Sequence, residues 1–206
     1  MNDFKTIKES VSAEIIEKKS RFIASVFPIG SKQEAEDCIF KIKKEHYNAK
    51  HNCFAYIVIG ENGEVLKKAS DDGEPSGTAG APSLEILEKQ NLCNVLVVVT
   101  RYFGGILLGT GGLLRAYSNA VLEALGGTTI INKTLGFEVS IEVNYKELGE
   151  LKHNLEKEKI TILNINYGEN VELLVEIPEN KYDKFLEKNK IFFIKTKTLT
   201  KKYIDN

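Results

Sequence analysis

The sequence is poor in cysteine and contains no long apolar run. Its three cysteines, Cys38, Cys53 and Cys93, are odd in number and far apart, so neither a disulfide framework nor a zinc site is indicated. No stretch of 18 apolar residues is present, and the first eight residues are charged rather than apolar. Neither a membrane span nor a signal peptide is therefore predicted, and we expect a cytoplasmic protein without a membrane partner.

The chain also lacks an excess of charge of either sign. Its formal net charge is −1, and neither half is a basic arm, so a purely electrostatic attachment to nucleic acid is not supported. A local basic face is still compatible with these totals. Apolar residues make up 42% of the chain and charged residues 28%, which is typical of a globular protein. The length of 206 residues fits one large or two small domains.

The first part of the chain mixes strand and helix patterns. Strands are predicted at residues 11–18, 20–29, 52–59, 64–69 and 95–100, with a turn at Glu61-Asn62-Gly63. The 95–100 segment is continuously apolar, as in a strand buried on both faces. Helices are predicted after the capping residue Ser31, near Ser83, and over residues 112–125.

The second part follows one regular order. Strand patterns at residues 135–143, 161–167, 171–177 and 191–199 alternate with helix patterns after Asn144 and Pro178. This β-α-β-β-α-β order is typical of a ferredoxin-like unit. The fold class predicted is α+β, with two α/β two-layer domains, residues 1–132 and 133–206.

The segment Ser70–Pro82 is too rich in glycine and proline for regular structure. It carries three carboxylates, Asp71, Asp72 and Glu74, followed by the hydroxyls of Ser76 and Thr78. Three interpretations are open. Exposed N–H groups ahead of a helix can hold an anion, the carboxylates can hold Mg²⁺, or the side chains can bond to their own loop. A Walker loop is excluded, because no Gly-Lys-Ser/Thr triplet follows the glycines.

The segment Thr100–Tyr117 begins at the end of the apolar strand. Arg101 and Tyr102 lie at this end, and a glycine-rich turn then opens the helix that carries Arg115 and Tyr117. A cation in the first helical turn opposes the helix dipole, so Arg115 calls for a nearby anion. That anion is either an external phosphate or the carboxylates of the Ser70–Thr78 loop. We predict that Arg101 and Arg115 converge on one anion-accepting site with this loop.

His51 directly precedes a predicted strand, and Cys53 lies at the start of that strand. Their spacing of two places them on one face, as in a nucleophile pair. Cys53 alternates with Ala55 and Ile57, however, and such an apolar face favours a buried, inert thiol. His51 is therefore the better site candidate.

Four segments of the sequence resemble the YigZ/IMPACT family in order and spacing. They are Lys19-Ser20-Arg21-Phe22-Ile23, the stretch from Ala49 to Tyr56, the stretch from Ser70 to Gly80, and Thr100-Arg101-Tyr102-Phe103-Gly104-Gly105 with Arg115-Ala116-Tyr117. The resemblance covers nearly the whole chain. It implies a first domain like a small-subunit ribosomal protein and domain IV of elongation factor G, and a second domain like domain V of that factor.

Eukaryotic relatives in this family act in translational control, so the resemblance implies a translation-associated role. We expect a non-enzymatic factor that binds RNA or a ribosome-associated protein through the Ser70–Tyr117 surface, without catalytic residues, metal or cofactor. The alternative is a small Mg²⁺-dependent hydrolase or ligand-binding enzyme that uses the acidic loop. The residues predicted to contact nucleic acid or another anion are Lys19, Arg21, His51, Ser76, Thr78, Arg101, Tyr102, Arg115 and Tyr117.

Overall fold

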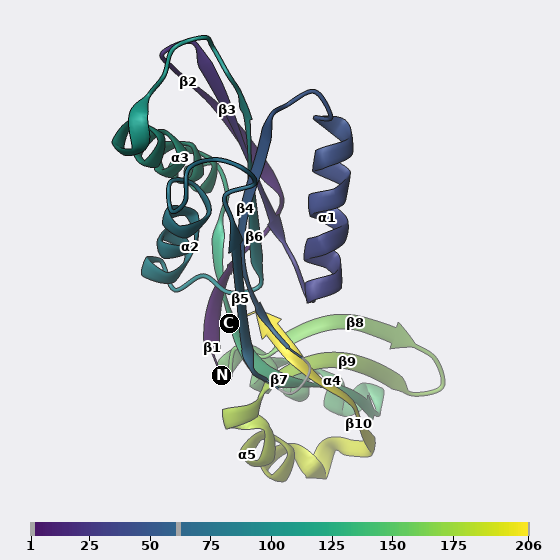
Figure 1. The fold of residues 1–206 in the computed structure, drawn as a ribbon. Helices are drawn as coiled ribbons and strands as arrows, with labels where there is room; N and C mark the ends of the chain where they lie inside the picture. Colours follow the sequence, from purple (N-terminus) through teal and green to yellow (C-terminus); the bar gives the residue numbers. More distant parts are fainter. Residues whose placement is uncertain (1–2, 61–62, 206) are drawn as a thin grey trace. The chain divides into compact units, whose positions relative to one another are not determined.

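The computed structural model describes residues 3–60 and 63–205. Glu61 and Asn62, which belong to the predicted turn, lie outside these residues. The chain divides into two compact units, Asp3–Ile131 and Asn132–Asn206. Each unit contains one sheet and its own helices (Figure 1). The α+β class is thereby confirmed.

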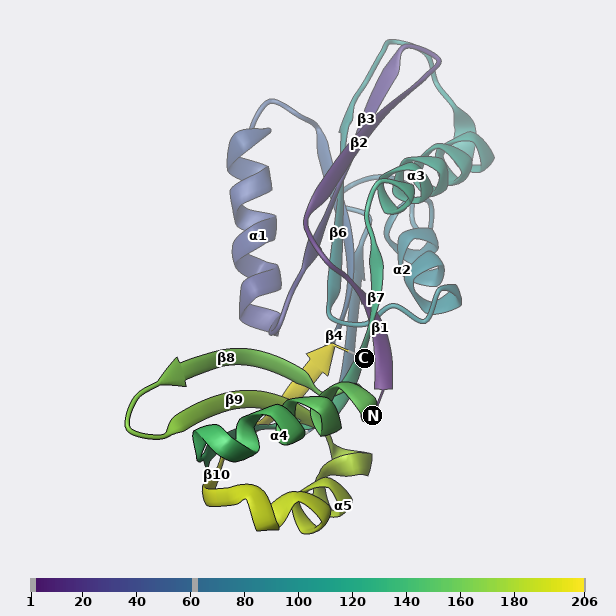
Figure 2. The same ribbon diagram turned by 180° about the vertical axis from the view of Figure 1, so that it is seen from behind.

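The first unit is built on an antiparallel sheet in the order β2-β3-β6-β4-β5. One helix covers one face of this sheet, and two helices cover the other (Figures 1 and 2). The strands are β1 (Asp3–Ile7), β2 (Val11–Glu17), β3 (Ser20–Pro28), β4 (His51–Ile59), β5 (Val65–Ser70) and β6 (Val95–Tyr102). The helices are α1 (Lys32–Glu45), α2 (Gly80–Lys89) and α3 (Gly109–Gly126).

The two central strands explain why this sheet carries helices on both faces. β4 and β6 are buried along almost their whole length, so both of their faces need cover. Phe54 and Tyr56 of β4 pack with Ile39 of α1 on one side. On the other side, Phe22 of β3 contacts Tyr117 of α3, with ring centroids 5.1 Å apart. The sheet of the first unit therefore has helices on both of its faces.

Three further details of the first unit differ from the sequence expectation. α2 begins at Gly80 rather than near Ser83, and α3 begins at Gly109 rather than at residue 112. Pro82 is compatible with the earlier start of α2, because a first helical turn needs no N–H from proline. The strand β1 was not predicted, although burial of Phe4 and Ile7 fixes it within the fold.

The second unit has the predicted β-α-β-β-α-β order. β7 is hydrogen-bonded to β9 and β10, and β9 to β8, so the strand order is β10-β7-β9-β8, as in a ferredoxin-like fold. The elements are β7 (Ile130–Val143), α4 (Tyr145–Lys157), β8 (Thr161–Tyr167), β9 (Val171–Pro178), α5 (Glu179–Asn189), a 3-10 turn (Lys190–Phe192) and β10 (Phe193–Asp205).

Helices α4 and α5 share one apolar core with the sheet of this unit. Leu151 and Leu155 of α4 and Phe185 of α5 are buried against alternate residues of β7 and β9, such as Ile141 and Leu173. The intervening residues of these strands face away from the helices, as the period of two requires. The second unit therefore has the two layers that were expected.

Candidate functional site

A cleft of about 440 Å³ lies in the first unit beside the end of β6. Its polar residues include His51, Glu74 and Arg101, which come from β4, the 70–80 loop and β6. Its apolar wall comes from the segment between β6 and α3 and from α3 itself, and consists of Phe103, Leu107, Leu108 and Leu113. An apolar cleft with a few convergent polar groups is the usual form of a binding site.

The pairing of strands brings the polar residues of the cleft together. β6 lies between β3 and β4, and Arg101 is aligned with Phe22 on one side and with His51 on the other. The Arg101 guanidinium lies over the Phe22 ring, 5.3 Å from its centroid. Arg101 Nη1 donates to Glu74 Oε1 over 2.7 Å, and the two side chains are only 7% and 3% exposed. Arg101 is thus held as half of a buried ion pair.

The Glu74 carboxylate accepts a second hydrogen bond. Tyr117 Oη donates to Glu74 Oε1 over 2.9 Å. Burial, together with the neighbouring Cys53 and the Glu74 carboxylate, raises the pKa of Tyr117, so this hydroxyl remains a neutral donor. Tyr117 therefore acts as a scaffold residue that fixes Glu74, and not as an exposed contact for nucleic acid.

His51 is oriented by the backbone. Its Nδ1 lies 2.9 Å from the carbonyl oxygen of Asp72, so the proton resides on Nδ1, which donates to that carbonyl. Its Nε2 then lies 3.8 Å from Glu74 Oε1, at the cleft. The second ring nitrogen of His51 therefore lies beside the Glu74 carboxylate, and His51 lines the cleft.

The Asp71 carboxylate is hydrogen-bonded to the backbone of its own loop. Its carboxylate accepts hydrogen bonds from the backbone N–H groups of Gly77, Ala79 and Gly80 at 2.8–2.9 Å. Burial alone would raise the pKa of Asp71, but these N–H donors together hold it below its usual value. Of the three interpretations of the loop, bonding to its own backbone describes Asp71.

The other polar residues of the loop are also engaged or turned away from the cleft. Asp72 contacts Lys43 Nζ at 2.6 Å and accepts from the Asn52 N–H at 2.8 Å. Thr78 is buried, and its hydroxyl donates to the Pro75 carbonyl, whereas Ser76 is exposed and does not line the cleft. Over residues 3–60 and 63–205, no three His, Cys, Asp or Glu side chains are grouped to hold a metal ion.

Cys53 does not form a pair with His51. Its thiol donates to the Asp71 carbonyl at 2.9 Å and to Tyr117 Oη at 3.4 Å. Burial raises the pKa of Cys53 to about 12, so the thiolate is not formed near neutral pH. The geometry agrees with a buried, inert thiol and contradicts a nucleophile pair.

Tyr102 points away from the cleft. Successive residues of a strand face opposite sides, so Arg101 faces α3 and Tyr102 faces α1. Tyr102 Oη lies 2.9 Å from His46 Nδ1, and the Arg21 guanidinium lies 5.3 Å from the centre of the Tyr102 ring. Arg21 also forms a two-pronged ion pair with Glu14. The predicted single surface that contains both Arg101 and Tyr102 is therefore wrong.

Arg115 is likewise separate from Arg101. It is exposed on α3 and lines a smaller hollow of about 110 Å³ with Glu17 and Lys18. Lys19 is exposed in the adjoining turn between β2 and β3. Because Arg115 faces this turn rather than the acidic loop, the predicted convergence of Arg101 and Arg115 is wrong.

The sequence interpretation missed the apolar residues around the cleft. Of the apolar residues that line the cleft, Phe103 is 51% exposed and Leu107 is 83% exposed. A signal was present, because Ile106-Leu107-Leu108 is an apolar triplet within a glycine-rich segment that is not a strand or a helix. The start of this segment passes close to the backbone at Lys19, and only glycine fits there. A Cβ on Gly104 would lie 2.0 Å from the Lys19 carbonyl carbon.

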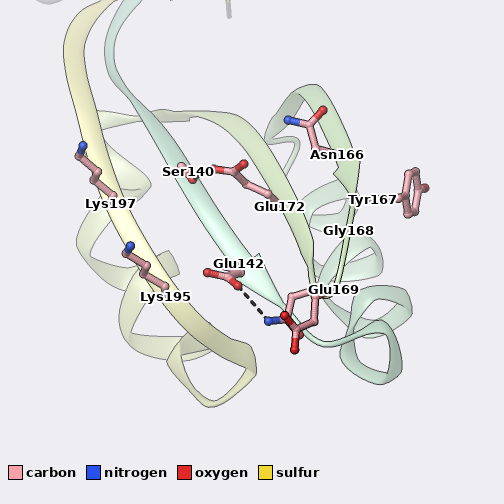
Figure 3. A pocket seen from close by; sticks show the side chains of 10 residues that line it. Ser140, Glu142, Asn166, Tyr167, Gly168, Glu169, Glu172, Lys195 and Lys197 are labelled. Atoms are coloured by element: carbon pink, nitrogen blue, oxygen red, sulfur yellow. Dashed lines mark hydrogen bonds between the residues drawn. The ribbon is translucent and has the colours of Figure 1, made fainter.

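A second hollow, of about 420 Å³, lies on the helix-free face of the second sheet (Figure 3). Lys195 and Lys197 of β10 line one side of it, and Glu142 and Glu172 of β7 and β9 lie beside them. The two carboxylates are engaged by neighbours, Glu142 by Asn170 and Glu172 by Ser140. These residues were not predicted, because the alignment of β10 beside β7 depends on the tertiary fold.

Comparison with known proteins places both units in families. Residues 18–125 match the Impact N-terminal domain, and residues 141–188 match a domain of unknown function, DUF1949. The IMPACT family member YvyE of Bacillus subtilis is 44% identical over 187 residues, which cover 91% of this chain and 85% of that protein. YigZ of Escherichia coli is 36% identical, over 83% of this chain and 84% of its own.

A solved structure shows the same fold over the full length. It is described as the crystal structure of an hypothetical protein, is 32% identical, and superposes with a TM-score of 0.65. The match covers 97% of this chain and 98% of the other. The domain match over more than half of the chain and the full-length relatives agree with the motifs around the cleft, and the chain therefore belongs to the IMPACT family.

Proposed function

We propose that this chain is a non-enzymatic, translation-associated factor that binds a ribosome-associated protein through the cleft beside His51. The observation that carries the proposal is the exposed apolar rim of this cleft, which we define as Phe103 and Leu107. Exposed apolar residues gathered at a concave site are typical of protein-binding surfaces. The rim contacts an apolar side chain of the partner, and the Glu74–Arg101 pair and His51 contact its polar groups.

The link of this chain to translation comes from its family resemblance. The resemblance of the two units to a small-subunit ribosomal protein and to domains IV and V of elongation factor G supports a place at the ribosome. This part of the proposal rests on similarity of folds, whereas the choice of a protein partner rests on the site.

The charges of the cleft support a protein rather than RNA at this position. The positive charge of Arg101 is neutralised by Glu74 at 2.7 Å, and Asp71 and Asp72 lie in the same loop as Glu74. Of these carboxylates, Glu74 lines the cleft, so a phosphate there would meet a negative charge and an arginine that is already paired. An apolar segment of a protein meets no such repulsion.

The engaged carboxylates argue against the Mg²⁺-dependent alternative. Asp71 accepts three backbone N–H bonds, Asp72 is paired with Lys43, and Glu74 is paired with Arg101. A Mg²⁺ ion requires oxygen ligands arranged in a near-octahedral shell. A Mg²⁺ ion here would compete with the hydrogen bonds and ion pairs that these carboxylates already make.

Photocrosslinking tests the proposal. A benzophenone amino acid replaces Leu107 in one variant and Leu122, an exposed leucine of α3 that does not line the cleft, in a control. After irradiation in cells, the ribosomal fraction is treated with RNase. We expect one discrete protein adduct from position 107 that survives RNase and does not form from position 122. Adducts that RNase removes, or equal adducts from both positions, would overturn the proposal.

A further inference from the structure

Two exposed aromatic rings lie on the outer side of α1 and just beyond its end. Phe40 of α1 is 71% exposed, and Tyr47, which follows the C-cap residue His46, is 84% exposed. At 100° per residue, Phe40 and Lys44 fall within about 40° of one another around the helix, on the side away from the buried Ala35 and Ile42. We call Phe40, Lys44 and Tyr47 the aromatic stripe.

Packing does not account for these rings. α1 covers its face of the sheet alone, and no other element of the first unit lies over its outer side (Figures 1 and 2). The helix dipole explains why Lys43 and Lys44 lie in the last turn of α1, since cations are favoured there. It gives no reason for Phe40 and Tyr47 to be aromatic, and an exposed ring adds nothing to the core.

The stripe is close to a third aromatic residue at the end of the sheet. His46, the residue next to Tyr47, contacts Tyr102, with ring centroids 6.0 Å apart. Arg21 lies against the same Tyr102 ring. The half-buried Tyr102 and the exposed Arg21 therefore continue the surface that begins at Phe40.

The charges of this surface are separated along the helix. Lys41 and Lys44 are exposed in the half of α1 that carries the aromatic stripe. The acidic residues of α1 lie mainly in its other half, where Glu36 contacts Lys32 and Lys68, and Asp37 accepts from Gln33. Glu45 is the acidic residue of the basic half, and it lies about 140° around the helix from Phe40.

We propose that this surface, Phe40, Lys41, Lys44, Tyr47, Tyr102 and Arg21, binds single-stranded nucleic acid. Bases stack on the exposed rings, and the lysines contact the phosphates. Arg21 contacts a phosphate by exchanging its ion pair with Glu14, which is exposed to solvent, unlike the buried pair of Arg101. This is the combination by which proteins bind single strands without reading their sequence. The surface lies on the α1 side of the sheet, so it is separate from the cleft, and the two proposals fail independently of each other.

Fluorescence anisotropy with a labelled (CA)₆ RNA tests this surface. The expected change for Phe40→Ala or Tyr47→Ala is a loss of affinity of about fivefold or more each, the lower end of what one base–aromatic stack contributes. Tyr167→Ala, which removes an exposed tyrosine of the second unit, is the matched control and leaves affinity unchanged. Because both rings are exposed, the melting temperature of each variant stays at the wild-type value.

Salt dependence gives a second measurement. Contacts from Lys41, Lys44 and Arg21 predict a slope of log affinity on log salt of about −2, and Lys44→Ala reduces its magnitude by about 0.7. The corresponding DNA oligonucleotide binds with similar affinity, because neither stacking nor phosphate contact depends on the sugar.

Three results would overturn the proposal. One is wild-type affinity in the Phe40→Ala, Tyr47→Ala double variant. Another is tighter binding of a duplex than of a single strand. The third is a wild-type protein that does not bind at about 100 μM in low salt, the weak end of ordinary non-specific binding. An acidic protein as the true occupant of this surface would give the third result.

Discussion

Arg101 and Glu74 form a 2.7 Å ion pair in which both side chains are almost completely buried. The pair joins the end of β6 to the 70–80 loop, and Tyr117 adds a hydrogen bond from α3. Three elements that are distant in sequence are thus tied together at the floor of the cleft. An arginine in such a position holds the scaffold, whereas an arginine that binds RNA is accessible to solvent.

Arg101→Ala is therefore expected to lower stability strongly. Removing one partner of a buried ion pair leaves the other charge uncompensated and typically costs about 3–5 kcal/mol. Urea denaturation measures the change in the free energy of unfolding. Arg21→Ala is the control, because its ion pair with Glu14 is exposed and is worth about 1 kcal/mol or less. Equal, small losses in both variants would contradict a scaffold role for Arg101.

Asp71→Asn is expected to destabilise the 70–80 loop at neutral pH by about 2 kcal/mol, since hydrogen bonds to a charged acceptor contribute about 1.5–3 kcal/mol. The folded-state pKa of Asp71 is lowered, so its contribution is present above the unfolded pKa of about 3.9 and is lost as the pH falls through the folded pKa. The difference between wild type and variant therefore shrinks on acidification. Urea denaturation across this pH range measures it, and a constant difference would contradict the assignment.

The three cysteines are expected to react at different rates in the folded protein. With a pKa of about 12, Cys53 at pH 8 is ionised in on the order of one molecule in ten thousand, and Cys93 is buried as well. Cys38 is only partly buried. N-ethylmaleimide labelling followed by peptide mass mapping should modify Cys38 first, and the other two only after unfolding. Labelling of Cys53 as fast as Cys38 would show that its thiol is accessible and activated.

A fragment of residues 133–206 is expected to fold alone. Its buried apolar residues come from β7, β9, α4 and α5 and form one cluster within the fragment. Thermal unfolding followed by circular dichroism should be cooperative. Leu151→Ala in the fragment removes a fully buried side chain and should cost about 2–5 kcal/mol. A gradual, non-cooperative melt of the unmodified fragment would contradict independent folding.

Much of the fold could be predicted because it depends on local patterns. The capping bond from Glu34 N–H to Ser31 Oγ is present as the Ser-x-x-Glu spacing predicts. The β-α-β-β-α-β order of the second unit follows from period-2 and period-3.6 segments, which are set by residues close in sequence. The strand β1 was missed because its five residues gain their burial from distant parts of the chain.

The candidate site was predicted less well than the fold. The sequence by itself determined which segments carry the chemistry, because the motifs that mark the family also surround the cleft. Only the tertiary structure decided the roles of their residues. Arg101 pairs with Glu74, 27 positions away, while its neighbour Tyr102 faces the opposite side of the sheet. Such pairings depend on strand register and helix packing, which bring together residues that no local pattern connects.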